Sequence, residues 1–436
     1  MGKIIKRTYL CLVFLSNIRE NMTALGALIG LFVAILLIIK KISPAYSLVL
    51  GALVGGIAGG LSLPDTVNVM IDGVRDVTPA ILRILTAGVL SGVLIKTGAA
   101  LAISDTIIRK LGEKHVFLAL ALATLLLCAI GVFIDVAVIT VAPVALSVGN
   151  RLNISKSKLL LMMIGGGKCG NIISPNPNTI IAAENFNAPL SEVMFVNLLP
   201  ALIGFIFTVF MIGRWIPNNK GAIPEKMTIN DKEGLPTFGA SIVAPVVTIL
   251  LLACRPLFGF VVDPLVALPI GGMAGIVATR QWKSFLPGLE YGLQKMSVVA
   301  ILLVGTGTIA GIIKNSTIKD YILEGLSHLP LGDALIAPVS GALMSAATAS
   351  TTAGATIASA SFSGTILAAG ISAVWGAAMI NAGATVLDHL PHGSFFHATA
   401  GATDLDLKEG LKLIPYETLI GLVLTISSLG LYLMVY

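Results

Sequence analysis

The sequence predicts an all-α polytopic membrane protein, and three observations support this prediction. Hydrophobic residues make up 56% of the 436 positions, while charged residues make up only 11%. A soluble domain needs about 25% charged residues to cover its surface. Apolar segments of about 20 residues, long enough to cross a bilayer, recur along the whole chain. The 46 glycines are typical of membrane helices that pack through small residues.

The apolar segments fall into two groups, one on each side of a polar stretch. The first group lies at residues 23–39, 46–62, 79–107, 116–149, 159–183 and 194–213. Within it, 116–149 is expected to fold back as two arms and 159–183 to be broken. The second group lies at residues 238–254, 262–279, 291–313, 333–382, 383–400 and 414–436. Here 333–382 is expected to form several helices and 383–400 to be broken.

The polar stretch Pro217–Pro236 divides the chain into halves of almost equal length. We therefore predict a first transmembrane repeat at residues 22–217, a cytoplasmic linker at 218–236 and a second, inverted repeat at 237–436.

The first 21 residues are predicted to be an N-terminal extension, because a convincing membrane helix begins only after Met22. Their apolar run, Tyr9–Leu15, is too short to span a bilayer. We expect Met22 to be the natural start, so that residues 1–21 would not belong to the native protein.

The two halves resemble one another in sequence. Gly88–Lys96 in the first half is similar to Gly307–Lys314 in the second, with two glycines four residues apart in each. Each half also ends with a pair of prolines at similar spacing, Pro177 and Pro200 or Pro391 and Pro415. Placing the lysine-rich loops in the cytoplasm requires an odd number of crossings per half. The halves are then inverted, which is typical of secondary transporters.

The segment Gly165–Thr179 is predicted to interrupt a membrane helix. Its three consecutive glycines and two prolines disfavour regular helix, and unwound backbone at membrane depth lines a cavity or lies buried in protein. Lys168 is predicted to hold an anion there, although a lysine can also extend to the interface. The candidate substrate-binding residues of this segment are Lys168, Gly170, Asn171, Ser174, Asn176, Asn178 and Thr179.

A second predicted break, Gly383–His397, contains three of the five histidines. Asp388 and His389 are candidates for proton coupling, because such groups form proton relays in transporters. A structural hydrogen-bond network is the alternative. His392, Gly393 and Ser394 are candidate substrate-binding residues.

Two segments that are expected to form hairpins accompany the breaks. Asp135 is an isolated carboxylate in an apolar run and is a third candidate for proton coupling. Its counterpart, Ser345–Gly354, is rich in hydroxyls that suit a hydroxy acid but also suit close helix packing. The candidate substrate-binding residues here are Thr348, Ser350, Thr351 and Thr352. Arg83, Lys96 and Lys295 lie near segment ends, where extension to the interface explains them.

Several motifs resemble the gluconate:proton symporter (GntP) family of bacterial permeases. They are Gly131–Val138, Ile173–Pro177 followed by Ala182 and Ala183, Lys96–Ala100, and Leu390–Gly393. The resemblance implies an ion-transporter-superfamily fold, with inverted repeats, re-entrant hairpins and broken helices, and a homodimer. It also implies proton-coupled uptake of gluconate or a related small organic acid.

The chain departs from the family pattern near the expected substrate. It reads Ser174–Thr179 where the family usually has Pro-Pro-His-Pro-Gly-Pro, and Met344 and Ser345 where an arginine is usual. The identity of the substrate therefore stays open between gluconate, another small hydroxy acid and a D-serine-like amino acid. Sodium coupling of a carboxylate transporter is a further alternative.

We thus expect a proton symporter in the bacterial plasma membrane, with a small anionic substrate, the proton and the lipid bilayer as partners. Enzymatic activity is not expected, since no nucleophile–base pair, zinc motif or P-loop is present. A channel fits two inverted breaks less well than a carrier does. No cofactor, metal or nucleic acid is expected, because the cysteines lack metal spacing and no basic cluster has interleaved aromatics.

Overall fold

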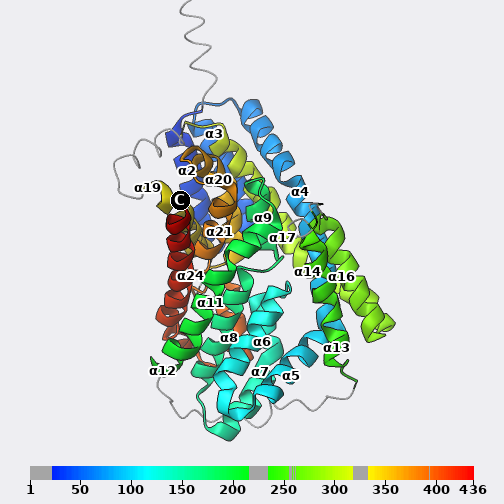
Figure 1. Ribbon diagram of the computed structural model, residues 1–436. Helices are drawn as coiled ribbons and strands as arrows, with labels where there is room; N and C mark the ends of the chain where they lie inside the picture. Colours follow the sequence, from blue (N-terminus) through cyan, green and yellow to red (C-terminus); the bar gives the residue numbers. More distant parts are fainter. Residues whose placement is uncertain are drawn as a thin grey trace, which may run out of the picture.

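The computed structural model describes residues 22–215, 234–254, 258, 260, 262–317, 332–391 and 393–436. Within these residues every element is helical, apart from an isolated β-bridge between Met22 and Ser316. The helices form an elongated bundle (Figure 1). The predicted extension 1–21 and most of the predicted linker 218–236 lie outside the described residues.

The first half forms a long series of helices. They are α2 (Ala24–Ile39), α3 (Pro44–Ala58), α4 (Leu63–Lys96), α5 (Ala99–Leu111), η1 (Glu113–His115), α6 (Val116–Ala129), α7 (Ile134–Leu152), α8 (Lys156–Asn171), α9 (Pro177–Asn185), α10 (Leu190–Val196), α11 (Leu198–Ile206), η2 (Phe207–Ile212) and α12 (Gly213–Trp215).

The second half repeats this order. Its helices are α13 (Phe238–Ser241), α14 (Val243–Leu252), α16 (Pro264–Thr279), η4 (Trp282–Ser284), α17 (Phe285–Lys314), α19 (Gly332–Thr348), α20 (Thr351–Ala368), α21 (Ala373–Gly383), α22 (Ser394–Ala402), α23 (Leu407–Leu411) and α24 (Ile414–Val435). Each half therefore contains a pair of short helices, one long helix, a hairpin, a broken helix and a closing helix.

The long helices α4 and α17 lie side by side (Figure 1) and contact one another through glycines. A Cβ atom on Gly73 would overlap the backbone of Gly307, and one on Gly292 would overlap the backbone of Gly88. The residue order along α17 is opposite to that along α4, so the two helices are antiparallel. Equivalent glycines make equivalent contacts in both directions, as two inverted repeats require.

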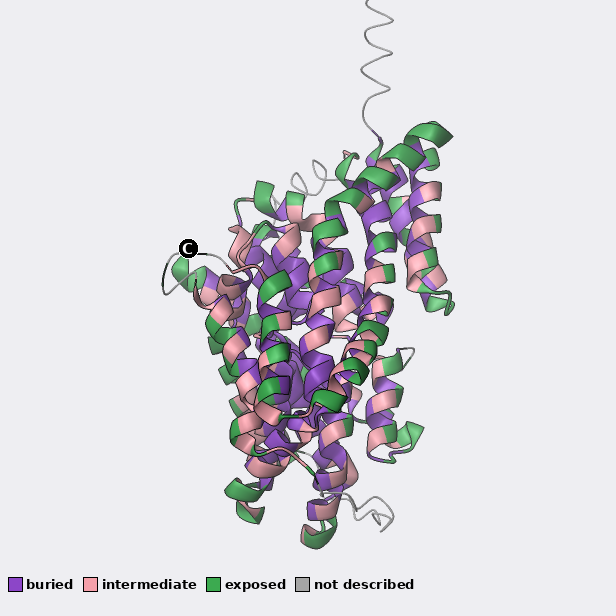
Figure 2. Cartoon of the chain, turned by 90° about the vertical axis from the view of Figure 1, so that its right-hand side faces the viewer, coloured by how far each residue is buried: buried purple, intermediate pink, exposed green. Residues whose placement is uncertain are grey.

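Five helical stretches of the described residues are long and apolar enough to cross a membrane. They are Leu63–Lys96, Ile134–Leu152, Leu190–Met211, Trp282–Lys314 and Leu407–Val435, and a sixth is possible if Ala99–Leu111 and Glu113–Ala129, which are bent by 105°, form one span. Many large apolar side chains face outward, as expected for lipid contact, and the buried residues line the middle of the bundle (Figure 2).

The short apolar helices α2, α3, α14 and α16 pair into two further hairpins. A helix of 16 residues is about 24 Å long, less than the roughly 30 Å hydrocarbon core. The tip of the α2–α3 hairpin packs against α17 away from both of its ends, where Ala45 contacts Gly305. Each of these four segments was expected to cross the bilayer alone, but the helices are too short to do so.

The break in the first repeat is shorter than predicted. The predicted break at Gly165–Gly167 is wrong, because α8 stays helical through these glycines to Asn171, and only residues 172–176 are irregular. A Cβ atom on Gly166 would overlap the carbonyl oxygen of Ala121 in α6, and one on Gly170 would overlap that of Leu125. These glycines therefore let α8 pack closely against α6 rather than unwinding it.

Candidate functional site

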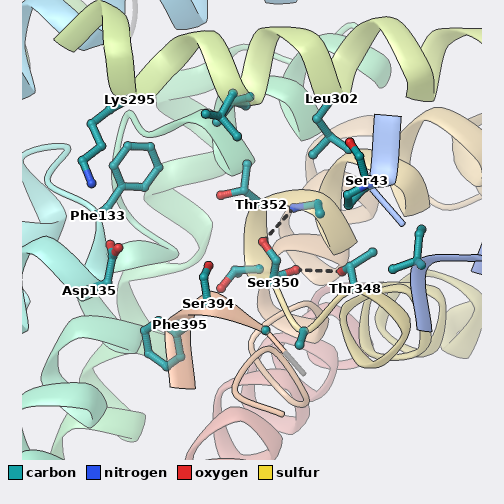
Figure 3. Close-up of a pocket in the computed structure, with 18 of the residues that line it drawn as sticks. Ser43, Phe133, Asp135, Lys295, Leu302, Thr348, Ser350, Thr352, Ser394 and Phe395 are labelled. Carbon is teal, nitrogen blue, oxygen red and sulfur yellow. Dashed lines mark hydrogen bonds between the residues drawn. The ribbon is translucent and has the colours of Figure 1, made fainter. Parts of the chain in front are cut away.

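The tips of the hairpins α6–α7 and α19–α20 meet at a cavity of about 1200 Å³ (Figure 3). The residues of α17 and the tip of the α2–α3 hairpin form one wall. The two tips and residues around Ser394, in the second break, form the other. In Figure 1, α6 and α7 lie in the lower part of the molecule and α20 in the upper part, so the tips reach the cavity from opposite ends.

Hydroxyl groups dominate the wall formed by the α19–α20 tip and the second break. The predicted residues Thr348, Ser350, Thr351, Thr352 and Ser394 all line the cavity (Figure 3). The side-chain oxygen of Ser350 accepts a hydrogen bond from the backbone N–H of Ala353 at 3.3 Å. The helix α20 thus begins at the cavity, with its first N–H groups directed toward it.

Charged side chains from both repeats line the same cavity: Asp135 and Lys295, and also Lys41 at the tip of the α2–α3 hairpin. Asp135 lies in the first turn of α7, and Lys295 lies well inside α17 (Figure 3). Lys295 was expected to extend to the interface from near a segment end; α17 begins ten residues earlier, at Phe285, and Lys295 lines the cavity. The Lys295 ammonium lies 5.7 Å from the centre of the Tyr291 ring, a cation–π contact that positions it.

Lys168 does not line the cavity. It lies in the last turn of α8, not in an unwound segment, and its side chain is 0% exposed. Its Nζ atom donates to Asp388 Oδ1 at 2.7 Å and to the carbonyl oxygen of Thr385 at 2.6 Å. It also donates to the carbonyl oxygen of Glu417 at 3.3 Å. The ammonium therefore joins α8 of the first repeat to the break and the closing helix of the second.

His389 and Glu417 complete this buried cluster. His389 Nδ1 lies 3.0 Å from both Lys168 Nζ and Asp388 Oδ1 and 4.0 Å from Glu417 Oε2. All four side chains are buried. The cluster of Lys168, Asp388, His389 and Glu417 is called the buried charge cluster below.

A hydrogen bond connects the buried charge cluster to the cavity wall. Thr351, which lines the cavity, donates to Asp388 Oδ2 at 2.5 Å. Asp388 thus accepts from Lys168 through one oxygen and from a cavity hydroxyl through the other. This hydrogen bond therefore links the cavity wall to the buried ion pair.

The other predicted residues of the first break form a buried amide network. Asn178 Nδ2 donates to Asn381 Oδ1 at 2.6 Å, and Asn381 Nδ2 donates to Thr179 Oγ1 at 2.9 Å. The Thr179 hydroxyl donates to Asn176 Oδ1 at 3.0 Å, and Asn176 Nδ2 donates to the carbonyl oxygen of Asn171 at 3.0 Å. This network binds the first break to α21 of the second repeat, and only Asn171 among its members also lines the cavity.

The remaining predicted residues have separate environments. Ser174 is fully buried, and its hydroxyl has no hydrogen-bond partner within the described part of the chain. Gly170 packs against α6, Gly393 lines the cavity, and His392 lies outside the described residues. Among described residues, no group of three His, Cys, Asp or Glu residues is arranged to hold a metal ion.

Sequence reasoning missed Glu417, Asn381 and the position of Lys295. Glu417 begins an apolar helix, where an acidic residue is common because it favours the helix N-terminus. Its isolation in the apolar stretch 414–436 was the signal that could have identified it.

Membrane-crossing helices, two inverted repeats and two hairpins that meet at a polar cavity define a polytopic membrane transporter. The chain belongs to the GntP permease family, whose model matches residues 22–435. It is accordingly a multi-pass protein of the cell membrane.

Known relatives differ in what they transport. The chain is 54% identical over 408 residues to an uncharacterized transporter of Haemophilus influenzae, covering 94% of this chain and 97% of the relative. It is 23% identical over 407 residues to a high-affinity gluconate transporter of Escherichia coli, covering 86% and 92%. It is 22% identical over 353 residues to the D-serine transporter DsdX of Escherichia coli, covering 74% and 79%.

The fold is also found in a solved structure. The crystal structure of the Alcanivorax borkumensis YdaH transporter, described as having an unusual topology, matches with a TM-score of 0.60 and 14% sequence identity. The match covers 85% of this chain and 88% of that one. At this identity the similarity concerns the fold alone.

Proposed function

We propose that the protein is a proton symporter that imports gluconate or a related small hydroxy acid. The observation that carries the proposal is the cavity itself, which combines hydroxyl groups with the Lys295 ammonium (Figure 3). The helices α7, α20 and α22 also begin at its wall, near Phe133, Ser350 and Gly393. The N-terminus of a helix carries partial positive charge and favours an anion.

Different cavity residues would bind different groups of such a substrate. Lys295 and the helix N-termini would attract the carboxylate. The amide of Asn171 and the hydroxyls of Thr348, Ser350 and Thr351 would pair with the substrate hydroxyls, since a buried hydroxyl needs a partner. Thr352 and Ser394 would extend this surface. We regard this as the substrate site.

The sequence context predicted that Lys168 holds the anion directly, but in this proposal its effect on the substrate is indirect. Because its ammonium is enclosed by protein acceptors and does not line the cavity, it would act on the substrate through Asp388 and Thr351 rather than by direct contact. Asn176, Asn178 and Thr179 would hold the first break in shape. Asp388 and His389 would take part in proton binding.

Transport into proteoliposomes tests the proposal. With purified full-length protein, an inward proton gradient is expected to drive accumulation of labelled gluconate, and a sodium gradient at equal pH is not. Counterflow of labelled substrate is expected as well, because a carrier exchanges and a channel does not. Uptake that follows the sodium gradient would reject proton coupling.

An amino acid of the D-serine type is the second candidate, and Asp135 favours it. A zwitterion would place its carboxylate near Lys295 and its ammonium near Asp135, since both charged side chains enter one cavity. In that case Asp135→Asn should abolish D-serine uptake. If the substrate is a hydroxy acid, the same variant should keep substrate binding.

We also propose a homodimer, as the family resemblance implies. Cross-linking of the protein in native membranes should give a single band at twice the monomer mass. A monomer at every cross-linker concentration would exclude it.

A further inference from the structure

Glu417 lies in the first turn of α24, with its side chain directed into the protein. It is 4% exposed, and its Oε2 atom has no hydrogen-bond partner within the described part of the chain. An ionised carboxylate without a partner in this position would bear the full cost of losing its water. A protonated carboxyl group avoids most of that cost.

Two neighbours compete for the Nδ1 atom of His389: the Lys168 ammonium, which can donate to it, and the Asp388 carboxylate, which can accept from it. Its Nε2 atom lies 3.1 Å from the carbonyl oxygen of Ile414 and 3.0 Å from the hydroxyl of Thr418. In the tautomer that satisfies this carbonyl, Nε2 carries the proton. Nδ1 then has two alternatives, both at 3.0 Å. Without a proton it accepts from Lys168, and with a proton it donates to Asp388. One proton therefore decides which partner the ring binds.

The charges of the buried cluster balance only when one proton is added. Lys168 and Asp388 neutralise each other in their 2.7 Å ion pair. With a neutral ring on His389, an ionised Glu417 would leave one net negative charge in the interior. A proton on Glu417 or on His389 removes it, and a net buried charge is strongly disfavoured.

Within the described part of the chain, few other titratable groups face Glu417. The elements packed against α24 are α8, α11, α19, α21 and η2. Of these, α8 contributes Lys168 and the buried thiol of Cys169, while α11, α21 and η2 contain no titratable residue. Asp333 of α19 lies within electrostatic range of Tyr432, which is near the other end of α24. The proton balance at Glu417 is therefore set by the buried charge cluster.

We propose that Glu417 and His389 form the binding site of the coupling proton, with Glu417 as its carrier and His389 as the relay to Asp388. This inference rests on the proposed proton symport. The proton leaves Glu417 Oε2 and binds His389 Nδ1, 4.0 Å away. Glu417 becomes a carboxylate, and His389 becomes an imidazolium that donates to Asp388.

The hydrogen bond from Thr351 to Asp388 couples this proton to the substrate. A substrate hydroxyl that engages Thr351 weakens the bond of Thr351 to Asp388 Oδ2. With that hydrogen bond weakened, the Asp388 carboxylate is stabilised more by a hydrogen bond from a protonated His389. Substrate binding therefore favours proton binding. By linkage, the proton favours the substrate to the same extent.

Infrared spectroscopy of the purified full-length protein tests the carrier directly and needs no substrate. At neutral pH the wild type should show the band of a buried protonated carboxyl group. The band should disappear in Glu417→Gln and shift in Glu417→Asp. It should stay in Glu409→Gln, the control, whose carboxylate lies on the short helix α23. An absent band in the wild type, or an unchanged band in Glu417→Gln, would overturn the proposal.

Transport by the same variants separates this inference from the proposed function. Gradient-driven gluconate accumulation should fall at least about tenfold in Glu417→Gln, while gluconate exchange at equal pH falls far less. Full gradient-driven accumulation in Glu417→Gln would reject Glu417 as the carrier. A wild type that ignores the pH gradient would reject the proton symport itself, whatever the infrared band shows. If Glu417→Gln does not fold, the wild-type band and its shift in Glu417→Asp decide the question.

Discussion

Lys168 and Asp388 form an ion pair that is almost completely excluded from solvent, with side-chain exposures of 0% and 1%. Removing one partner of such a pair leaves an uncompensated charge, whereas replacing both does not. The ion pair also joins the two repeats, so its loss affects their packing as well as the local site.

Lys168→Met is therefore expected to lower the free energy of unfolding by about 3–5 kcal/mol. The double variant Lys168→Met/Asp388→Asn should recover much of this loss, because no lone charge remains. Thermal unfolding in detergent measures both. Equal melting temperatures for the single and double variants would contradict the ion-pair explanation.

Lys295→Gln is expected to raise the KM for an anionic substrate about tenfold, which corresponds to roughly 1.4 kcal/mol. The melting temperature should stay the same, because Lys295 is only half-buried and its contact is with the ring of Tyr291 rather than with a carboxylate. Uptake kinetics provide the measurement. Lys283→Gln, on the exposed helix η4, is the control, and an equal effect of both variants would remove Lys295 from the site.

At the residue scale, the sequence identified several of the charged side chains inside the protein, but it did not predict which groups they contact. Lys168, Asp135 and Asp388 were identifiable because isolated charges in apolar runs are costly and are kept for a function. Their division into a cavity and a buried cluster depends on the tertiary packing of α8 against α24, which no local pattern contains. Lys295 was placed near a segment end because the apolar window begins later than the helix α17 itself.

Among the elements, α6 and α8 are held together by small residues rather than by a break in the helix. Gly170→Ala would place a Cβ atom on the carbonyl oxygen of Leu125. In Gly430→Ala of α24, the added Cβ atom would meet nothing within 4 Å. Both are membrane-helix glycines, which makes them a matched pair.

Gly170→Ala should therefore destabilise the protein by about 1–3 kcal/mol, the usual cost of overpacking. Gly430→Ala should be neutral or slightly stabilising, because alanine favours helix. Melting temperatures in one detergent provide the comparison. A neutral Gly170→Ala would mean that α6 and α8 are less closely packed than described.

The extent of several helices could not be predicted from apolar windows. The helix α4 begins at Leu63, well before the predicted start at residue 79, because Ser62 caps it by accepting from Asp65 N–H at 3.2 Å. Its first turns carry charged residues, so hydropathy does not detect them. Conversely, the three glycines of α8 were interpreted as a break, because helix propensity alone ignores the neighbour that requires them.

For the whole molecule, the antiparallel crossing of α4 and α17 predicts sidedness. These helices are equivalent in the two repeats, so their N-terminal ends must face opposite sides of the membrane. From the charge pattern of the loops we expect the start of α17 to lie inside.

A single cysteine at Asp72, which is exposed in α4, should react with an impermeant reagent from outside the cell. A cysteine at Lys283 should react only after the cells are opened. Labelling of both from the same side would contradict the inverted repeats. The antiparallel arrangement of α4 and α17 could be predicted from the sequence, because the paired glycines are present in each half.

In a proton symporter the substrate and the proton enter together. Adding gluconate to a weakly buffered suspension of proteoliposomes should make the external medium more alkaline, in proportion to the gluconate taken up. Lys295→Gln should lose the alkalinisation and the uptake in parallel. Gluconate uptake with no change in external pH would contradict the claim.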